Sequence, residues 1–126
     1  ETEFSLQHCV AISLIDGKNV FASYDQSSRE RAAELSSRIG VRAGDIYSNA
    51  YPKDWGGEVT VHLKDGGAVT AARNACKGDP ELPLNRDEMI DKARDLLTFA
   101  TVNDVDAVID GVLGMANGGD VPQFSL

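Results

Sequence analysis

The chain has 126 residues, of which 42% are hydrophobic and 25% are charged, a composition typical of one ordinary globular domain. Its formal net charge is −8, and most of this charge falls after residue 55. Because an acidic surface repels phosphate groups and anionic lipid, we expect neither a nucleic-acid partner nor a membrane partner. No apolar stretch reaches the roughly 18 residues of a membrane span, and the two cysteines form no disulfide framework, so we expect a cytoplasmic protein.

The most apolar stretch of the chain lies near its beginning and predicts a helix from Leu6 to Ile15. Ser5 can accept a hydrogen bond from a backbone amide of the first turn, and Gly17 can adopt the left-handed conformation that ends a helix. The stretch is apolar on nearly every side, so we expect other elements to cover it.

An amphipathic helix and a short strand are predicted next. The helix spans Ser28–Ile39, is capped by Asp25 or Ser27, and carries one apolar stripe that can cover the first helix. Val41–Ile46 is expected to form a short strand. The segment Tyr47–Gly57 is predicted to be a loop, because a proline and two glycines break any periodicity.

A β-hairpin is predicted in the middle of the chain. Apolar and polar residues alternate strictly along Glu58–Lys64, and Ala68–Arg73 can return as the antiparallel partner. Between them, Asp65 and Gly66 favour a type I′ turn, in which both central residues have positive φ. A hairpin alone is marginally stable in water, so we expect a third strand or a helix to cover it.

Two further helices are predicted after a proline-rich connector, Lys77–Leu84. The first is capped by Asn85, and its apolar side chains recur at helical spacing. These are Met89, Ile90, Ala93, Leu96, Leu97 and Ala100. The second spans Asp104–Met115 behind Asn103, with its apolar residues expected to face inward, and is ended by two glycines. Those inward residues are Val105, Val108, Ile109 and Val112. Val121–Leu126 are expected to be poorly ordered.

This order of elements predicts the α+β class. We expect a small antiparallel sheet with a hairpin, packed against helices in two layers, as one domain over residues 1–126.

His8 is the residue with the clearest chemical potential, because it places a titratable imidazole at the start of an apolar helix. One interpretation is a general acid or base; the other, which spacing alone favours, is a partly buried imidazole bonded to a neighbouring carbonyl. Access to His8 from a concave surface would distinguish them. Gln7 beside it could bind a substrate oxygen or make an ordinary polar contact at the helix start.

No metal site is expected, because the two histidines and two cysteines lack metal-ligand spacing. The glycine pairs at 66–67 and 118–119 are typical of a turn and a helix end, not of a phosphate-binding loop.

Three stretches of the chain, in this order, resemble the C-terminal domain of the MmgE/PrpD family. They are FSLQHCVAISLIDG (Phe4–Gly17), EVTVHLKDG (Glu58–Gly66) after a Tyr-Pro pair, and KGDPELPLNRDEMIDKARDLL (Lys77–Leu97). The last is similar to the family pattern G-D-P-x-x-P-L, although Ala93 stands where phenylalanine is usual. The family includes 2-methylcitrate dehydratase, cis-aconitate decarboxylase and iminodisuccinate epimerase.

The resemblance implies that the chain is the C-terminal lid of a larger two-domain enzyme, whose N-terminal helical domain is absent and would be its partner. It implies a hydro-lyase that needs no cofactor and acts on a small di- or tricarboxylate such as 2-methylcitrate, with the isolated chain inactive. His8 occupies the position of a family tyrosine and is the expected catalytic residue, with Gln7 as a substrate-binding residue. Two alternatives stay open: a related decarboxylase or epimerase, and a domain for packing or homodimer contacts without catalytic residues.

Overall fold

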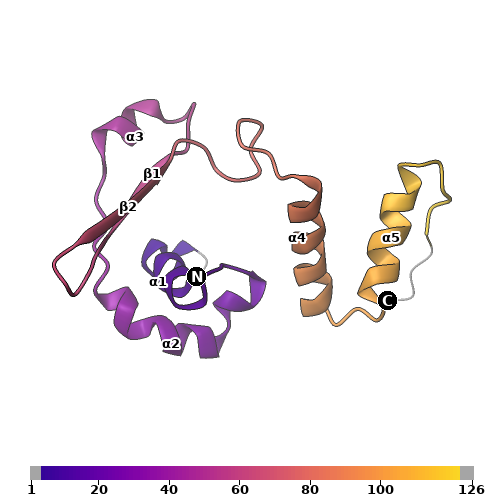
Figure 1. Ribbon diagram of the computed structural model, residues 1–126, viewed down its shortest axis with the longest axis horizontal. Helices are drawn as coiled ribbons and strands as arrows, with labels where there is room; N and C mark the ends of the chain where they lie inside the picture. The colour runs from indigo at the N-terminus through magenta and orange to yellow at the C-terminus, as the bar shows by residue number, and fades with distance from the viewer. Residues whose placement is uncertain (1–3, 123–126) are drawn as a thin grey trace. The chain divides into compact units, whose positions relative to one another are not determined.

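The computed structural model describes residues 4–122, which divide into two compact units (Figure 1). Unit 1 combines the chain up to residue 41 with the chain from residue 86 onward, and unit 2 is the inserted segment 42–85. Compactness alone does not define a domain, so a single domain over residues 1–126 stays a prediction. None of the helices between residues 4 and 122 has both the length and the apolar content needed to cross a bilayer.

The first helix, α1 (Leu6–Asp16), begins and ends as its sequence predicts. The Ser5 hydroxyl accepts a hydrogen bond from the His8 amide at 3.3 Å. At the other end, Gly17 has a φ of 70°, and its amide donates to the Ser13 carbonyl at 3.0 Å. The two capping interactions therefore fix the length of α1.

A second helix, α2 (Gln26–Ser37), packs against α1 (Figure 1). Of the two predicted caps, Asp25 is the one used: its Oδ1 accepts from the Ser28 amide at 2.7 Å. The contact between the helices forms the core of unit 1, in which three small or branched side chains are fully buried. These are Ala11, Ile12 and Ala32.

The expectation that α1 would be covered on every side is wrong for the described residues. Leu14 is 49% exposed and Ile15 is 43% exposed. The reason is geometric, since α2 lies against one side of α1 and can shield only the residues on that side.

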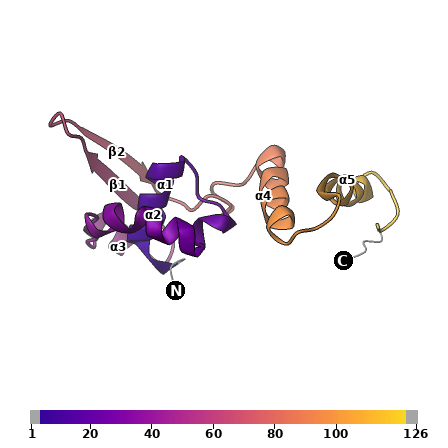
Figure 2. The same ribbon diagram turned by 90° about the horizontal axis from the view of Figure 1, so that it is seen from below.

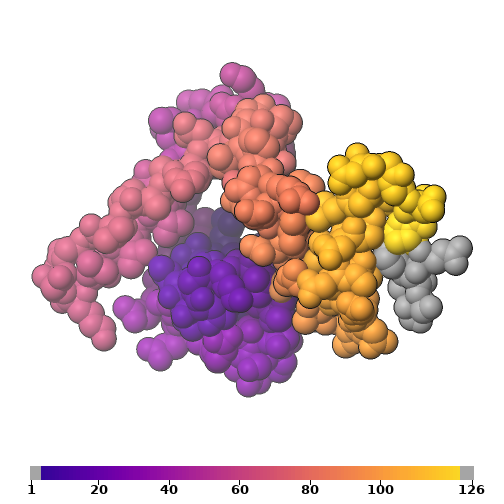
Figure 3. Space-filling view, turned by 45° about the vertical axis from the view of Figure 1, so that its right-hand side comes forward, coloured from indigo at the N-terminus to yellow at the C-terminus, as the bar shows by residue number. Residues whose placement is uncertain are grey.

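The last two helices, α4 (Arg86–Phe99) and α5 (Val105–Met115), form a helical hairpin and lie against each other (Figure 3). The cap of α5 is Asp104 and not Asn103: Asp104 has a φ of 50°, and its Oδ1 accepts from the Ala107 amide at 3.1 Å. Ile109 is buried as predicted, whereas Val112 is 50% exposed, so the inward face is narrower than expected.

Two glycines close α5, as the sequence predicts. Gly118 has a φ of 84°, and its amide donates to the Met115 carbonyl, while the Gly119 amide donates to the Gly114 carbonyl. This is the Schellman arrangement, which uses helix-terminal carbonyls that would otherwise lack partners. Most of the predicted poorly ordered tail, residues 123–126, lies outside the described residues.

In unit 2, strands β1 (Gly57–His62) and β2 (Ala68–Arg73) pair antiparallel as predicted (Figure 2). Val61 lies opposite Val69, and the Thr60 and Thr70 hydroxyls bond across the ladder at 2.9 Å. Within residues 4–122 the sheet has these two strands, so of the two expected ways of covering the hairpin, a third strand or a helix, the third strand is absent. The α+β class is confirmed.

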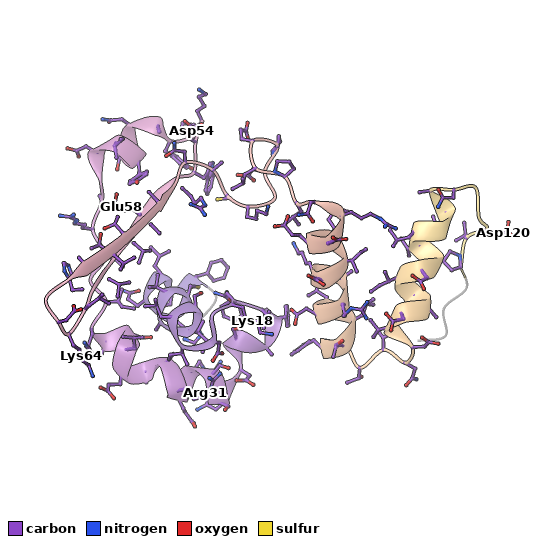
Figure 4. The ribbon with its side chains drawn as sticks, viewed as in Figure 1. Lys18, Arg31, Asp54, Glu58, Lys64 and Asp120 are labelled. Atoms are coloured by element: carbon purple, nitrogen blue, oxygen red, sulfur yellow. The ribbon has the colours of Figure 1, made fainter. Side chains whose placement is uncertain are left out.

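The turn of this hairpin differs from the type I′ turn that we expected. The Leu63 amide donates to the Gly67 carbonyl and the Gly66 amide to the Leu63 carbonyl, so residues 64–66 form a three-residue loop. Only Gly66, with a φ of 88°, is left-handed there, because Asp65 does not have a positive φ. The Asp65 carboxylate instead accepts from the Gly67 amide, which stabilises a type I turn followed by a left-handed glycine. Lys64 marks the tip (Figure 4).

The predicted strand Val41–Ile46 is wrong, because a short helix, α3 (Asp45–Ala50), occupies its end and the start of the predicted loop. Tyr47 on α3 packs closely on the backbone at Gly56. A Cβ atom at Gly56 would lie 2.9 Å from both the Arg73 carbonyl oxygen and the Tyr47 ring. Glycine at this position therefore lets α3 approach the hairpin.

Candidate functional site

His8 lies in the first turn of α1 and is 5% exposed. Its Nε2 donates a hydrogen bond to the Ser23 carbonyl at 2.8 Å, and Ser23 is itself buried. Because a carbonyl can only accept, this contact places a proton on Nε2. A buried imidazole bonded to a nearby carbonyl is the environment expected if His8 has a structural role. A catalytic role for His8 stays a prediction.

Gln7 lies beside His8 in the chain and is half-buried. Its Oε1 accepts a long hydrogen bond from the Ser5 hydroxyl at 3.4 Å. This is the polar contact at a helix start that the sequence allowed, and it leaves the amide nitrogen of Gln7 available as a donor to a ligand.

The Ser23 carbonyl, which accepts from His8, belongs to a short 3-10 helix, η2 (Phe21–Tyr24). This helix was not predicted from the sequence. The Ser23 hydroxyl accepts from the amide of Val20, the residue before η2, at 3.0 Å, and this bond stabilises the start of the helix. The Phe21 amide donates to the Asp95 carboxylate of α4 at 3.0 Å. Hydrogen bonds to both α1 and α4 thus fix η2 within unit 1.

A cleft of about 500 Å³ opens where η2 meets α4. Its apolar lining comes from Val20, Phe21, Tyr24 and Leu96, and its polar lining from Asn19, Asp91, Lys92 and Asp95. Neither His8 nor Gln7 is among the described residues that line it. The structure therefore does not bring the two predicted site residues into this cleft.

The cleft residues were not predicted from the sequence, although two spacings could have indicated them. Phe21 and Tyr24 are three residues apart, and Asp91 and Asp95 are four apart on one helix. Each spacing places two side chains on the same face of its element. Recognising the first pair requires knowing that η2 is helical.

A salt bridge with two hydrogen bonds lies at the end of α1. Arg31 of α2 (Figure 4) donates to both carboxylate oxygens of Asp16, at 2.7 and 3.0 Å. This hydrogen bonding, reinforced by the charge of Arg31, lowers the pKa of Asp16. The pKa of Asp25 is also lowered, chiefly because its carboxylate accepts from the Ser28 amide. Both interactions are structural and do not form a catalytic pair.

Among residues 4–122, no three histidine, cysteine, aspartate or glutamate side chains gather in a group that could hold a metal ion.

Unit 1 consists of helices around an anchored 3-10 turn, unit 2 contains a β-hairpin, and the fold class is α+β. The family model described as "MmgE/PrpD C-terminal domain" matches residues 1–113. The chain therefore belongs to the MmgE/PrpD C-terminal domain family, whose domains serve as lids of that group of enzymes. No curated protein and no solved structure matches the chain significantly.

Proposed function

We propose that this chain is the lid domain of a hydro-lyase that needs no cofactor and acts on a small di- or tricarboxylate such as 2-methylcitrate. The observation that carries the proposal is the family match over residues 1–113. The resemblance of three separate stretches, in the family's order, supports it independently of the fold.

The partner in this proposal is a helical domain that binds most of the substrate, and a homodimer of the whole protein is a further proposed contact. Closure of a lid excludes water from the reacting groups and completes the site. The chemistry is removal of a proton next to a carboxylate followed by loss of water, a step that positioned acid and base groups accelerate.

Within this proposal, Gln7 binds a substrate oxygen through its amide nitrogen and His8 donates a proton. The geometry sets a condition on His8. Its Nε2 proton is engaged by the Ser23 carbonyl at 2.8 Å, so it reaches a substrate only if η2 moves away from α1.

The 5% exposure of His8 favours a second candidate function, a domain that packs on its partner and contributes no catalytic side chain. In that case the imidazole stabilises the lid, and the reacting groups all come from the helical domain.

An activity screen tests the reaction class. A protein that joins this chain to a family helical domain is assayed with 2-methylcitrate, citrate and cis-aconitate, and the 126-residue chain is assayed alone. We expect dehydration of 2-methylcitrate or citrate by the two-domain protein and no turnover by the chain alone. Loss of carbon dioxide from cis-aconitate would assign a related decarboxylase instead. A folded two-domain protein that is inactive on all three acids, or an active isolated chain, contradicts the proposal.

The substitution His8→Phe separates the two candidate functions, with His62→Phe as the matched control on an exposed strand position. A catalytic His8 predicts that kcat falls by about 10²- to 10⁴-fold in protein that is still folded. A packing role predicts that kcat per folded molecule changes by less than about threefold while the free energy of unfolding falls.

A further inference from the structure

The cleft between η2 and α4 has no part in the proposed reaction. Its volume of about 500 Å³ lies within the roughly 300–1,000 Å³ that small-molecule sites occupy. All of its lining residues belong to unit 1.

Two aromatic side chains form one wall of the cleft. Phe21 and Tyr24 stand three residues apart in η2, and side chains at that spacing eclipse one another in a 3-10 helix, so both reach the same side. Each of the two rings contacts another ring. Phe21 contacts Phe99 with centroids 4.4 Å apart, and Tyr24 contacts His8 with centroids 5.8 Å apart.

Two carboxylates also line the cleft. Asp91 and Asp95 are one helical turn apart on α4 and both line the cleft. One Asp95 oxygen, Oδ2, accepts from the Phe21 amide, which fixes this carboxylate beside the aromatic wall. Lys92 also lines the cleft, so the lining carries two negative charges and one positive charge.

We propose that this cleft binds a small organic cation, an alkylammonium group with a short apolar chain. The faces of aromatic rings attract such cations, and carboxylates in the lining neutralise their charge. The same carboxylates repel a di- or tricarboxylate, so this site is separate from the proposed substrate site.

An NMR titration of the complete 126-residue chain tests the proposal, with n-butylammonium chloride as the probe. We expect saturable shifts of amide resonances in η2 and in the turn of α4 that contains Asp91 and Asp95. Sodium chloride controls for ionic strength, and sodium butyrate, which has the same chain length and the opposite charge, controls for apolar binding. A lysine-containing tripeptide with blocked ends serves as a second probe. Tighter binding of the tripeptide would identify a protein side chain as the natural source of the cation.

Matched variants locate the site. Asp91→Asn removes a charge from an exposed helix position and Phe21→Leu removes one ring, and each is expected to weaken binding about 2- to 30-fold. Asp79→Asn and Tyr51→Leu make the same changes in unit 2 and are expected to leave binding unchanged. The proposal is overturned if butyrate shifts the same resonances as strongly, or if butylammonium causes no saturable shift. It is equally overturned if both cleft variants bind like the parent chain.

Discussion

At the scale of single residues, the His8 imidazole joins two parts of unit 1 through one buried hydrogen bond. Its Nε2 donates to the Ser23 carbonyl, and Ser23 in turn closes η2 by accepting from Val20. A buried carbonyl that loses its donor keeps the full cost of having been removed from water. The contact therefore matters to stability whatever His8 does in a reaction.

We expect His8→Phe to lower the free energy of unfolding by about 1–3 kcal/mol, because phenylalanine fills the space but leaves the Ser23 carbonyl unpaired. His8→Gln, which keeps an N–H donor, should lose less. Urea unfolding monitored by circular dichroism measures both values. Equal stability of His8→Phe and the parent chain would show that water replaces the lost bond.

Asp16 should make the free energy of unfolding depend on pH in the acidic range. Hydrogen bonds from Arg31 lower the pKa of Asp16 in the folded state, so its contribution is complete above the ordinary carboxyl pKa of about 3.9 and is lost as pH falls through the lower folded value. Asp16→Asn should therefore have a lower Tm than the parent at about pH 7, and the difference should shrink toward about pH 2. Thermal unfolding across this range tests it, with Asp110→Asn as a control on an exposed part of α5. A difference in Tm that is independent of pH would contradict the assignment.

At the scale of elements, the β1–β2 hairpin depends on a glycine at the end of its loop. Gly66 has a φ of 88°, a conformation in which a side chain is strained although nothing lies within 4 Å of the position a Cβ would take. The cost of Gly66→Ala is therefore one of backbone conformation and not of crowding.

We expect Gly66→Ala to destabilise the hairpin by about 1–2 kcal/mol, because an L-residue in the left-handed region costs that much. Amide hydrogen exchange of Val61 and Val69, which lie opposite each other, reports the loss locally. Gly57→Ala is the control, since a Cβ there also meets nothing and the backbone is not left-handed. Equal exchange in the two variants would mean that the loop relaxes to another turn.

The sequence predicts those elements whose signals are local. Alternation along Glu58–Lys64 indicates a strand, and Ser5 and Gly17 bracket α1. The type of the hairpin turn could not be predicted from the sequence, because Asp65-Gly66 suits both a two-residue and a three-residue loop. Helix α3 was missed because six residues carry too little periodicity to outweigh the β-branched side chains of Val41 and Ile46.

The site was less predictable than the fold, because its contacts join distant parts of the chain. His8 is correctly singled out as unusual, but its burial depends on a carbonyl 15 residues away. The cleft depends on Phe21 and Asp95, which are 74 residues apart, and no local pattern reports that pair.

At the scale of the whole molecule, the fully buried apolar side chains among residues 4–122 lie together in one cluster. Ala11, Ile12 and Ala32 form the buried cluster between α1 and α2, whereas no residue of α4 is buried and β2 is exposed along its length. Elements with few buried apolar contacts open locally at lower free energy than the core does.

We therefore expect amide hydrogen exchange to be slowest at Ala11 and Ile12 in α1, and faster in α4 and in the β1–β2 hairpin by about tenfold or more. Exchange measured by NMR on the complete chain resolves these groups. Equal protection of all three elements would show that the molecule opens only as a whole.

Unit 2 interrupts unit 1, and this nesting has a consequence during synthesis on the ribosome. The Phe21 amide donates to the carboxylate of Asp95, which is translated 74 residues later. Synthesis of these 74 residues takes about 4 to 15 seconds at ordinary elongation rates. Throughout that interval the aromatic face of η2 has emerged without α4. The nascent polypeptide thus exposes an apolar surface of a kind that chaperones bind. Translation speed therefore becomes a determinant of the yield of folded protein.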